Sequence, residues 1–440
     1  MRTLVAIGLL AAAILPAAAQ QEYPATLTGH AVLPAESLTP TPADAPAAMK
    51  VSGKFTGDTP ARLTSEPTDG AELPFNGQPL QGFSGIKTLG DGTYMVLTDN
   101  GFGKKVNSPD AMLMFHHVKP DFKTGKVEIL ETTFLKDPNK VVPFLIANEA
   151  SDERYLTGWD LDTEGFQPID DLVFIGDEFG PYLVAVDRKT GVVKEFYETE
   201  LDGNTVRSPD NYAVSMPNPD GKMPAINLKR SKGFEGFAAS PDGKTLYPLL
   251  EGPIWDADAA SYEKVDGTEA LRILEFNVAD RTFTGRSWLY PLEADGHAIG
   301  DFNMIDATRG LIIERDNGQG DADQACADGQ TNACFDSPAK FKRIYLINMD
   351  GVESGQPVKK VGYIDLMNIQ DPNGLARLGK REDGRFTFPF VTIEDVDRID
   401  ETHIIVANDN NFPFSKGRSA TERDNNEFMT LEVGDFLQAK

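Results

Sequence analysis

The sequence predicts an all-β protein, a β-propeller of four-stranded antiparallel blades, on three observations. Short runs of Val, Ile, Leu, Phe and Tyr alternate with Asp-Gly, Asn-Gly and Pro-Asp-Gly turns along most of the 440 residues. No helical periodicity is sustained for long. One kind of hairpin occurs five times, and most copies are followed by two further strand-like runs, which is typical of a radial repeat. Five blades are recognisable, and a sixth blade built from the region before Gly82 is an open alternative.

The N-terminal stretch MRTLVAIGLLAAAILPAAAQ has the features of a secretory signal peptide over residues 1–19. A short basic head precedes an apolar run that is too short to span a bilayer, and small residues form a cleavage site. We therefore expect an exported protein, periplasmic or secreted, without a membrane span; a buried N-terminal helix is the alternative. Residues 20–70 are expected to form an arm and linker, and its stretch ATLTGHAVL to donate the strand that closes the ring. Residues 71–440 form the predicted propeller domain.

Acidic residues outnumber basic ones. The chain has 68 Asp and Glu against 42 Lys and Arg, which gives a formal net charge of −26. Such a surface repels nucleic acid and anionic membranes, so both are excluded as partners, whereas cations are attracted. We expect a monomer. Cys326 and Cys334 flank a loop rich in Gly, Asp and Ala and are expected to form a local disulfide in an oxidising compartment, with two free thiols as the alternative.

The five hairpins carry polar residues at the same open end. In each copy, two polar positions lie equally far from the centre of the turn, so antiparallel pairing would set them opposite each other. In most copies both residues are acids, and like charges that face each other destabilise a strand pair. The first-strand positions are Ser84, Glu164, Glu235, Asn303 and Glu394, and the second-strand positions are Asp99, Asp177, Glu251, Asp316 and Asp409.

The first strand of every propeller blade lines the central channel, so these positions should converge on one mouth. Carboxylates gathered there repel each other unless some are protonated or a cation lies among them. Oxygen-only ligands favour Ca²⁺, with Mg²⁺ or Mn²⁺ as alternatives. The alternative without a metal is that the acids are structural hydrogen-bond acceptors. The expected metal ligands are Asp99, Glu164, Asp177, Glu235, Glu251, Asp316, Glu394 and Asp409.

Basic residues in the loops at this end indicate an anionic substrate such as a phosphate ester. Arg230 and Lys232, which precede the third hairpin, are the candidates for holding the phosphate oxygens. His297 is the histidine expected to approach the mouth as an acid or base, with a structural role as the alternative. Solvated surface charge is the alternative for the basic residues. The other basic residues at this end are Lys104, Lys105, Arg315, Lys416 and Arg418.

Four stretches, DTEGF, GDEFGPYL, KGFEGFAASPDGKTLYPLLEGP and NDNNF, carry a resemblance to a known family. They resemble the phytase-like propeller family, which is described as having esterase-like activity of phytase. The resemblance covers roughly residues 83–436. It implies a secreted or periplasmic propeller that hydrolyses phosphoric esters with the help of calcium. Ser84 and Asn303 stand where the other hairpins have Glu, so not every blade need donate a ligand.

Together these observations predict an exported, metal-dependent phosphoric-ester hydrolase that acts on a small anionic substrate. Two alternatives stay open. One is a non-catalytic periplasmic propeller that binds a ligand or a cation. The other is a sugar-lactone hydrolase, which would use the metal without a phosphate clamp.

Overall fold

The computed structural model describes residues 20–56, 70–214, 221 and 223–440. The predicted signal peptide, residues 1–19, lies outside the described residues. Among the residues that are described, no helix is both long and apolar enough to cross a membrane. Strands make up most of the regular structure, and the single α-helix of this part of the chain, α1 (Gly434–Gln438), lies near the C-terminus.

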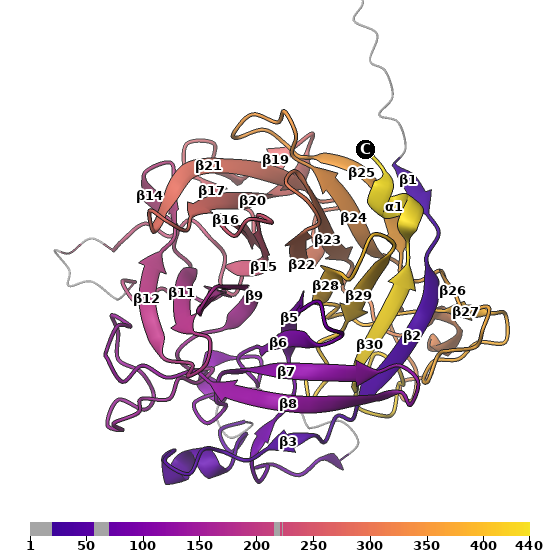
Figure 1. Cartoon of the computed structure of the whole chain (residues 1–440), viewed down its shortest axis with the longest axis horizontal. Coiled ribbons are helices and arrows are strands. Elements are labelled where there is room, and N and C mark those ends of the chain that lie inside the picture. Colours follow the sequence, from indigo (N-terminus) through magenta and orange to yellow (C-terminus); the bar gives the residue numbers. More distant parts are fainter. Residues whose placement is uncertain (1–19, 57–69, 215–220, 222) are drawn as a thin grey trace, which may run out of the picture.

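Four-stranded antiparallel sheets form the body of the molecule (Figure 1). The innermost strands contact one another in the closed order β5, β9, β15, β22, β28 and back to β5, so the sheets surround one axis. This arrangement confirms the predicted propeller of antiparallel four-stranded blades. Strands are given from the innermost outward: the first sheet has β5 (Phe83–Thr88), β6 (Tyr94–Thr98), β7 (Met114–Asp121) and β8 (Lys126–Phe134), and the second has β9 (Thr163–Ile169), β10 (Leu172–Asp177), β11 (Tyr182–Asp187) and β12 (Val193–Glu198). The third sheet has β15 (Phe234–Ala239), β16 (Thr245–Leu250), β20 (Thr268–Asn277) and β21 (Thr282–Pro291), and the fourth has β22 (Ala298–Met304), β23 (Arg309–Arg315), β24 (Lys342–Asn348) and β25 (Lys359–Asp365). The last sheet has β28 (Asp395–Arg398), β29 (His403–Ala407), β30 (Asn426–Glu432) and β2 (Thr26–Leu33).

Short strands and 3-10 helices lie in the connections between these strands and next to the outer strands. They are β1 (Gln21–Tyr23), β3 (Leu38–Thr39), η1 (Ala47–Lys50), β4 (Gln78–Pro79), η3 (Lys105–Asn107), β13 (Glu200–Leu201), β14 (Asn204–Thr205), β17 (Trp255–Asp256), β18 (Ser261–Tyr262), β19 (Lys264–Val265), η4 (Ala322–Gln324), β26 (Ile369–Gln370) and β27 (Arg385–Phe386).

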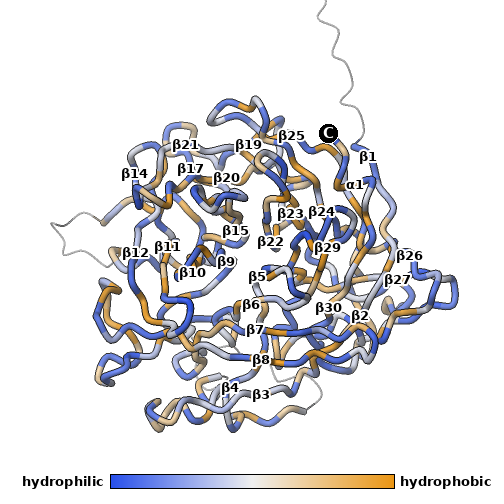
Figure 2. The backbone as a smooth tube through the Cα atoms, in the orientation of Figure 1, coloured by the Kyte–Doolittle hydropathy of each residue, from blue (hydrophilic) through white to orange (hydrophobic). Residues whose placement is uncertain are grey.

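Apolar side chains fill the spaces between successive sheets, as expected where both faces of a sheet are covered. Phe166 and Ile175 of the second sheet pack with Leu97 of the first sheet, and all three are almost fully buried. Leu311 and Val396 likewise meet between the last two sheets. Burying one such side chain contributes about 1.5–3 kcal/mol. In Figure 2, where the backbone is coloured by hydropathy, apolar stretches lie along strands and many of the hydrophilic stretches lie in the loops.

The N-terminal region closes the ring. β2, which lies within the stretch ATLTGHAVL, pairs antiparallel with β30 from Thr26↔Glu432 to Leu33↔Asn426 and is the outermost strand of the last sheet. It also touches β8 of the first sheet at one parallel register point. Residues 34–50, which follow β2 and are rich in Pro and Ala, are not a free linker, because Met49 packs in a buried cluster. The described residues before Gly82 form no additional four-stranded sheet.

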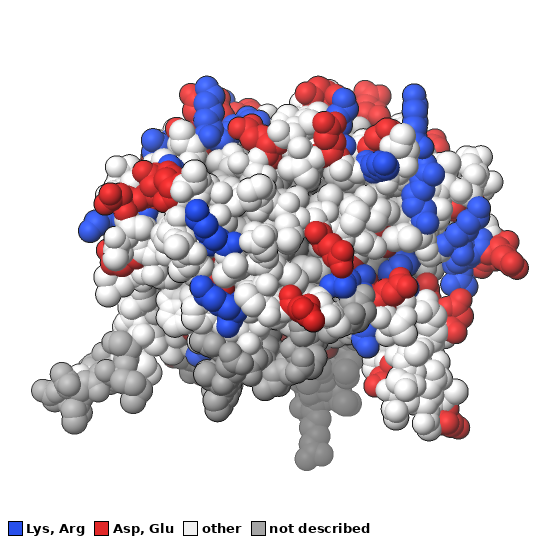
Figure 3. Space-filling view, turned by 90° about the horizontal axis from the view of Figure 1, so that it is seen from below, with Lys and Arg blue, Asp and Glu red and all other residues white. Residues whose placement is uncertain are grey.

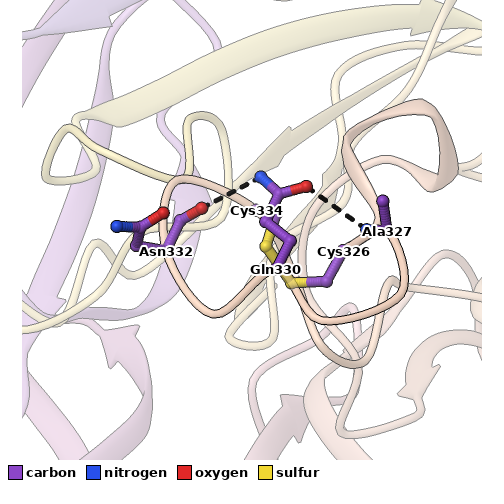
Figure 4. Close-up of a disulfide and its surroundings, with 5 residues drawn as sticks. All are labelled: Cys326, Ala327, Gln330, Asn332 and Cys334. Carbon is purple, nitrogen blue, oxygen red and sulfur yellow. Dashed lines mark hydrogen bonds between the residues drawn. A yellow bond between two sulfur atoms is a disulfide. The ribbon is translucent and has the colours of Figure 1, made fainter.

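Cys326 and Cys334 form a disulfide in the loop between β23 and β24, which confirms the predicted pairing (Figure 4). The side chain of Gln330 forms two hydrogen bonds within this loop. Its side-chain oxygen accepts a hydrogen bond from the N–H of Ala327 (3.3 Å), and its side-chain nitrogen donates to the carbonyl of Asn332 (3.0 Å).

The face of the molecule in Figure 3 shows basic and acidic side chains mixed, without a large area of one sign. Besides the acidic side chains on the surface, a group of acidic residues is buried inside the ring. Fully or nearly fully buried members of this group are Asp162, Glu164, Asp177, Glu178, Glu235, Glu251, Asp301, Glu394, Asp395 and Asp409.

Candidate functional site

A β-bulge in the innermost hairpins determines which residues reach the channel end. In the third hairpin Phe234 pairs with Leu250 and Gly236 with Leu249, so Glu235 is the extra residue. The first, second and fourth hairpins have a register shift near the same place. The equivalent positions, which we call the acidic mouth, are at the start of the first strands and at the end of the second strands. On the first strands or directly before them they are Ser84, Glu164, Glu235, Gly300 and Glu394, and at the ends of the second strands they are Asp99, Glu178, Glu251, Arg315 and Asp409.

The second hairpin differs from the prediction by one residue. Glu178, and not Asp177, takes the position equivalent to Glu251. The Asp177 carboxylate instead accepts hydrogen bonds from the N–H groups of Asp162 (2.9 Å) and Gly180 (2.6 Å), so it braces the backbone around the hairpin. Counting the same number of residues on both sides of the turn led to Asp177 and not to Glu178, because the bulge adds a residue to one strand only.

The fourth hairpin departs further from the prediction. Its turn lies at residues 305–308, between β22 and β23, and not at Arg309-Gly310. Gly300 and Arg315 therefore occupy the two mouth positions, so this blade presents a cation and no carboxylate there. The predicted residue Asn303 lies further along β22 and accepts a hydrogen bond from the side chain of Gln167 (2.8 Å).

Asp316, the other predicted residue of this hairpin, makes its contacts with the segment that leads into β24. Its carboxylate accepts a hydrogen bond from the N–H of Lys340 (2.9 Å) and pairs with the buried ammonium group of Lys342 (2.9 Å). These contacts are structural, and the side chain is absent from the carboxylate groups described next.

Two groups of three carboxylates meet at the acidic mouth. Oxygen atoms of Glu164, Glu235 and Glu394, the first triad, lie within 4.8 Å of one another. Oxygen atoms of Glu178, Glu235 and Glu251, the second triad, satisfy the same limit. Glu235 is common to both, and the five side chains are only 6–8% exposed. The predicted approach of Glu235 to Glu251 is therefore present in the structure.

The first triad has an oxygen without a partner. Oε2 of Glu164 is buried and accepts no hydrogen bond, and Glu394 accepts one, from the hydroxyl of Ser84 (3.0 Å). A buried acceptor in this state costs free energy unless a proton or cation supplies the interaction. Oxygens that bind one Ca²⁺ at 2.3–2.6 Å lie at most about 5 Å apart. The first triad therefore fits such a cation in both donor chemistry and spacing.

Further acids surround the triads. Asp99 is partly exposed and Asp409 is buried, both at the predicted second-strand positions. Asp162 was not predicted, because it lies before β9 and outside the repeated positions. It accepts hydrogen bonds from the N–H and the side chain of Asn100 (3.1 and 2.6 Å). The alternating acids of DLDTEGF, which include Asp162 and Glu164, are the signal that could have identified it.

Burial and mutual repulsion shift the pKa values of these carboxyl groups upward. Burial, then the charges of Glu235 and Asp162, hold the pKa of Glu164 well above its usual range. Burial raises the pKa of Glu394 to about 7, although Arg315 opposes the shift. Glu251 is the exception. Burial acts to raise its pKa, but the charge of Lys232, followed by that of Arg315, lowers it overall.

The predicted phosphate-binding residues differ in their surroundings. Lys232 lies at the mouth and forms an ion pair with Glu251. Arg230 is exposed and pairs with Asp210, which belongs to neither triad. Arg315, which the sequence placed only among the basic residues of this end, occupies a mouth position, and its buried Nε has no hydrogen-bond partner. The structure therefore assigns a mouth location to Lys232 and Arg315 but not to Arg230.

Two other basic side chains have structural surroundings. Nδ1 of His297 lies 3.0 Å from Glu314, and its ring packs on Phe341 at a centroid distance of 4.4 Å. Within the described part of the chain, His297 makes no hydrogen bond or ion pair with a triad carboxylate. Arg418 is mostly buried and pairs with Glu427 in the last sheet. The contacts of His297 agree with a structural role, the alternative to an approach to the mouth.

Comparison with known proteins gives a related sequence and solved structures of low similarity to this chain. An uncharacterized secreted protein of Arthroderma benhamiae is 27% identical over 130 residues, which are 28% of this chain and 25% of that protein. The match thus spans about a quarter of that relative's length. Similar solved structures include Kuenenia stuttgartiensis hydrazine synthase (TM-score 0.30, 9% identity, 78% of this chain and 81% of that chain) and the Dos1 propeller (TM-score 0.30, 12% identity, 81% and 70%).

The model of one protein family matches residues 78–412, which is well over half of the chain. The matched region begins just before β5 and contains all innermost strands and both triads. The chain therefore belongs to the Phytase-like family, described as having esterase-like activity of phytase.

Proposed function

We propose that the protein is an exported, metal-dependent hydrolase of phosphoric esters that binds its divalent cation, Ca²⁺ in the first place, at the acidic mouth. The observation that carries the proposal is the first triad, three buried carboxylates within 4.8 Å of one another with one unpartnered oxygen. Family membership supports the ester-hydrolase class. The signal-like N-terminus and the name of the secreted relative support export.

The residues of the mouth have separate roles in this proposal. Glu164, Glu235 and Glu394 would hold the cation, which when bound supplies Lewis-acid polarisation of a phosphoryl oxygen and acidifies coordinated water. The guanidinium of Arg315, whose Nε has no partner, would donate to a phosphate oxygen. In the metal-free protein the pKa of Glu394 lies at about 7, so binding of the cation near neutral pH should release its proton.

A panel of phosphate monoesters, assayed with EDTA and with added Ca²⁺, tests this function. We expect turnover that depends on Ca²⁺. Removal of even an outer-sphere partner of a metal site typically costs about 10–100-fold, so Glu235→Gln, which removes a carboxylate common to both triads, should cost at least about 100-fold. Glu401→Gln, an exposed residue in a turn away from the mouth, is the matched control. Equal turnover in EDTA and Ca²⁺ would contradict the proposal.

A second candidate is a non-catalytic propeller that binds a cation. The ion pairs of Arg230 with Asp210 and of Lys232 with Glu251 favour it, because they occupy the two predicted phosphate ligands. Calcium binding without turnover of any phosphate ester would support this candidate. A parallel panel of sugar lactones in the same assay distinguishes the lactone-hydrolase alternative from both.

A further inference from the structure

The second triad already contains a cation. The ammonium group of Lys232 forms an ion pair with Glu251, and its charge also acts on Glu178 and Glu235. The backbone holds this lysine in place, since the N–H of Gly252 donates to the carbonyl of Lys232 (3.1 Å). A Cβ at Gly252 would lie 2.6 Å from Cβ of Lys232, so the side chain packs directly on the glycine. The Lys232 side chain is 38% exposed, and its ammonium is the cation that pairs with the second triad.

The first triad has no such group. Among the described residues, no ion pair involves Glu164, Glu235 or Glu394. Arg315 acts on Glu235 and Glu394 through its charge, but its guanidinium donates a hydrogen bond to Asn317 (2.8 Å) and forms no ion pair with either carboxylate. The buried Oε2 of Glu164 has no partner. The first triad thus offers carboxylate oxygens without a resident cation.

We infer that the acidic mouth binds one divalent cation, at the first triad, and that Lys232 takes the place of a second cation at the second triad. The inference rests on the proposed function for the presence of a bound cation. It also changes the predicted role of Lys232 from a phosphate ligand to an internal counter-ion that limits the mouth to one ion.

The physical reason lies in the common ligand. Both triads meet the spacing of a cation site, and they have Glu235 in common. An ammonium group has three donors and one positive charge, so it satisfies nearby carboxylates. A divalent ion within the same triad as this ammonium would meet strong like-charge repulsion, stronger than an ion at the first triad would meet. Removal of the ammonium should therefore open the second triad to a second ion, which Glu235 would bridge to the first.

Calorimetric titration of Ca²⁺ into the metal-free protein tests the inference. The wild type should bind one ion per chain, and Lys232→Gln and Lys232→Met should each bind two. Lys232→Arg keeps the charge and should still bind one. The matched control is Lys105→Gln, because Lys105 is another lysine of this end that packs on Trp159 and forms no ion pair with either triad.

Manganese gives a second readout that does not depend on calorimetry. Electron paramagnetic resonance should show one isolated Mn²⁺ in the wild type and two coupled ions in Lys232→Gln, because Glu235 would bridge them. Glu164→Gln identifies the first triad. It should weaken binding of the single ion at least about tenfold, and in the Lys232→Gln background it should leave one ion.

The outcomes separate this inference from the proposed function. Two ions in the wild type, or one ion in folded Lys232→Gln and Lys232→Met, overturn the inference and leave metal-dependent hydrolysis intact. Failure of every variant to bind Ca²⁺ or Mn²⁺ overturns both. One ion in the wild type and two in the lysine variants support the inference even when no ester is hydrolysed. Circular dichroism of each variant establishes that it is folded.

Discussion

Two buried carboxylates of this propeller, Glu427 and Glu394, are stabilised in different ways. Glu427 on β30 accepts two hydrogen bonds from Arg418 (2.9 and 2.7 Å), and Nε2 of His30 lies 3.0 Å away. Glu394 accepts one hydrogen bond, from the hydroxyl of Ser84. Burial acts to raise both pKa values. That of Glu427 nevertheless falls to about 2 because Arg418 and His30 outweigh burial, whereas that of Glu394 rises to about 7.

The comparison shows that burial of an acid does not by itself indicate a binding site. Arg418 is held in place by the fold, since its guanidinium lies over the rings of Phe386 and Phe390 at 5.1 and 5.0 Å. Glu427 therefore has a permanent counter-ion. The first triad has no permanent counter-ion within hydrogen-bond distance, so its charge depends on protons or on an ion from solution.

The largest expected effect comes from removing the permanent counter-ion. Arg418→Met leaves Glu427 buried without its main partner, which should lower the free energy of unfolding by about 3–5 kcal/mol. Added Ca²⁺ should not restore it. Denaturant unfolding measures the change, and Arg398→Met, at an exposed position of β28, should stay within about 0.5 kcal/mol of wild type. A loss below about 1 kcal/mol for Arg418→Met would refute the assigned role.

The pH dependence of the metal-free protein should differ between the two regions. Between the ordinary pKa of 4.5 and about 7, folded Glu394 keeps a proton that the unfolded chain releases. Stability therefore falls as pH rises through this range, by about 1.4 kcal/mol per unit and about 3 kcal/mol in all. Saturating Ca²⁺ should abolish the fall. Glu427 acts in the opposite sense, because its contribution is present above pH 4.5 and is lost as pH falls toward about 2.

Melting curves in EDTA at pH 5 and pH 7.5 measure this difference, and the Glu394→Gln variant identifies its source. That variant should show a smaller decline than wild type. Equal stability of the metal-free wild type at both values would mean that the mouth carboxylates already have partners.

Removal of the cation should have a somewhat smaller effect. A ligand that binds only the folded state stabilises it by about 2.7 kcal/mol at a hundredfold excess over Kd. EDTA should therefore lower the melting temperature of wild type at pH 7.5 by several degrees, and excess Ca²⁺ should restore it. Glu235→Gln should lose this response, whereas Glu401→Gln should keep it. Identical curves in EDTA and Ca²⁺ would instead favour a structural role for the acids.

The smallest expected effect concerns the disulfide. Cys326 and Cys334 are eight residues apart, and closing so short a loop stabilises the fold by no more than about 2.5 kcal/mol. Reduction should lower the free energy of unfolding by that amount or less and leave the Ca²⁺ affinity unchanged, because neither cysteine belongs to a triad. Thiol titration of the denatured, unreduced protein should find no free thiol. Two titratable thiols would contradict the pairing.

The fold was predictable because its signals are local. A turn motif such as Pro241-Asp242-Gly243 between two apolar runs predicts a hairpin wherever it occurs, and five copies of one hairpin predict a radial repeat. The approach of Glu235 to Glu251 followed from the same local symmetry, since both belong to one hairpin. Their burial and distance agree with that expectation.

The sequence by itself therefore determined the antiparallel propeller, the disulfide and the location of the acidic mouth. Only the tertiary structure decided which residues form the acidic mouth. A bulge adds one residue to one strand, so symmetric counting chose Asp177 where the fold presents Glu178. The partners of Arg230 and His297, and the distinction between Glu394 and Glu427, depend on contacts between separate segments of the chain. Such contacts are set by how whole blades pack around the axis, and a local pattern carries no information about them.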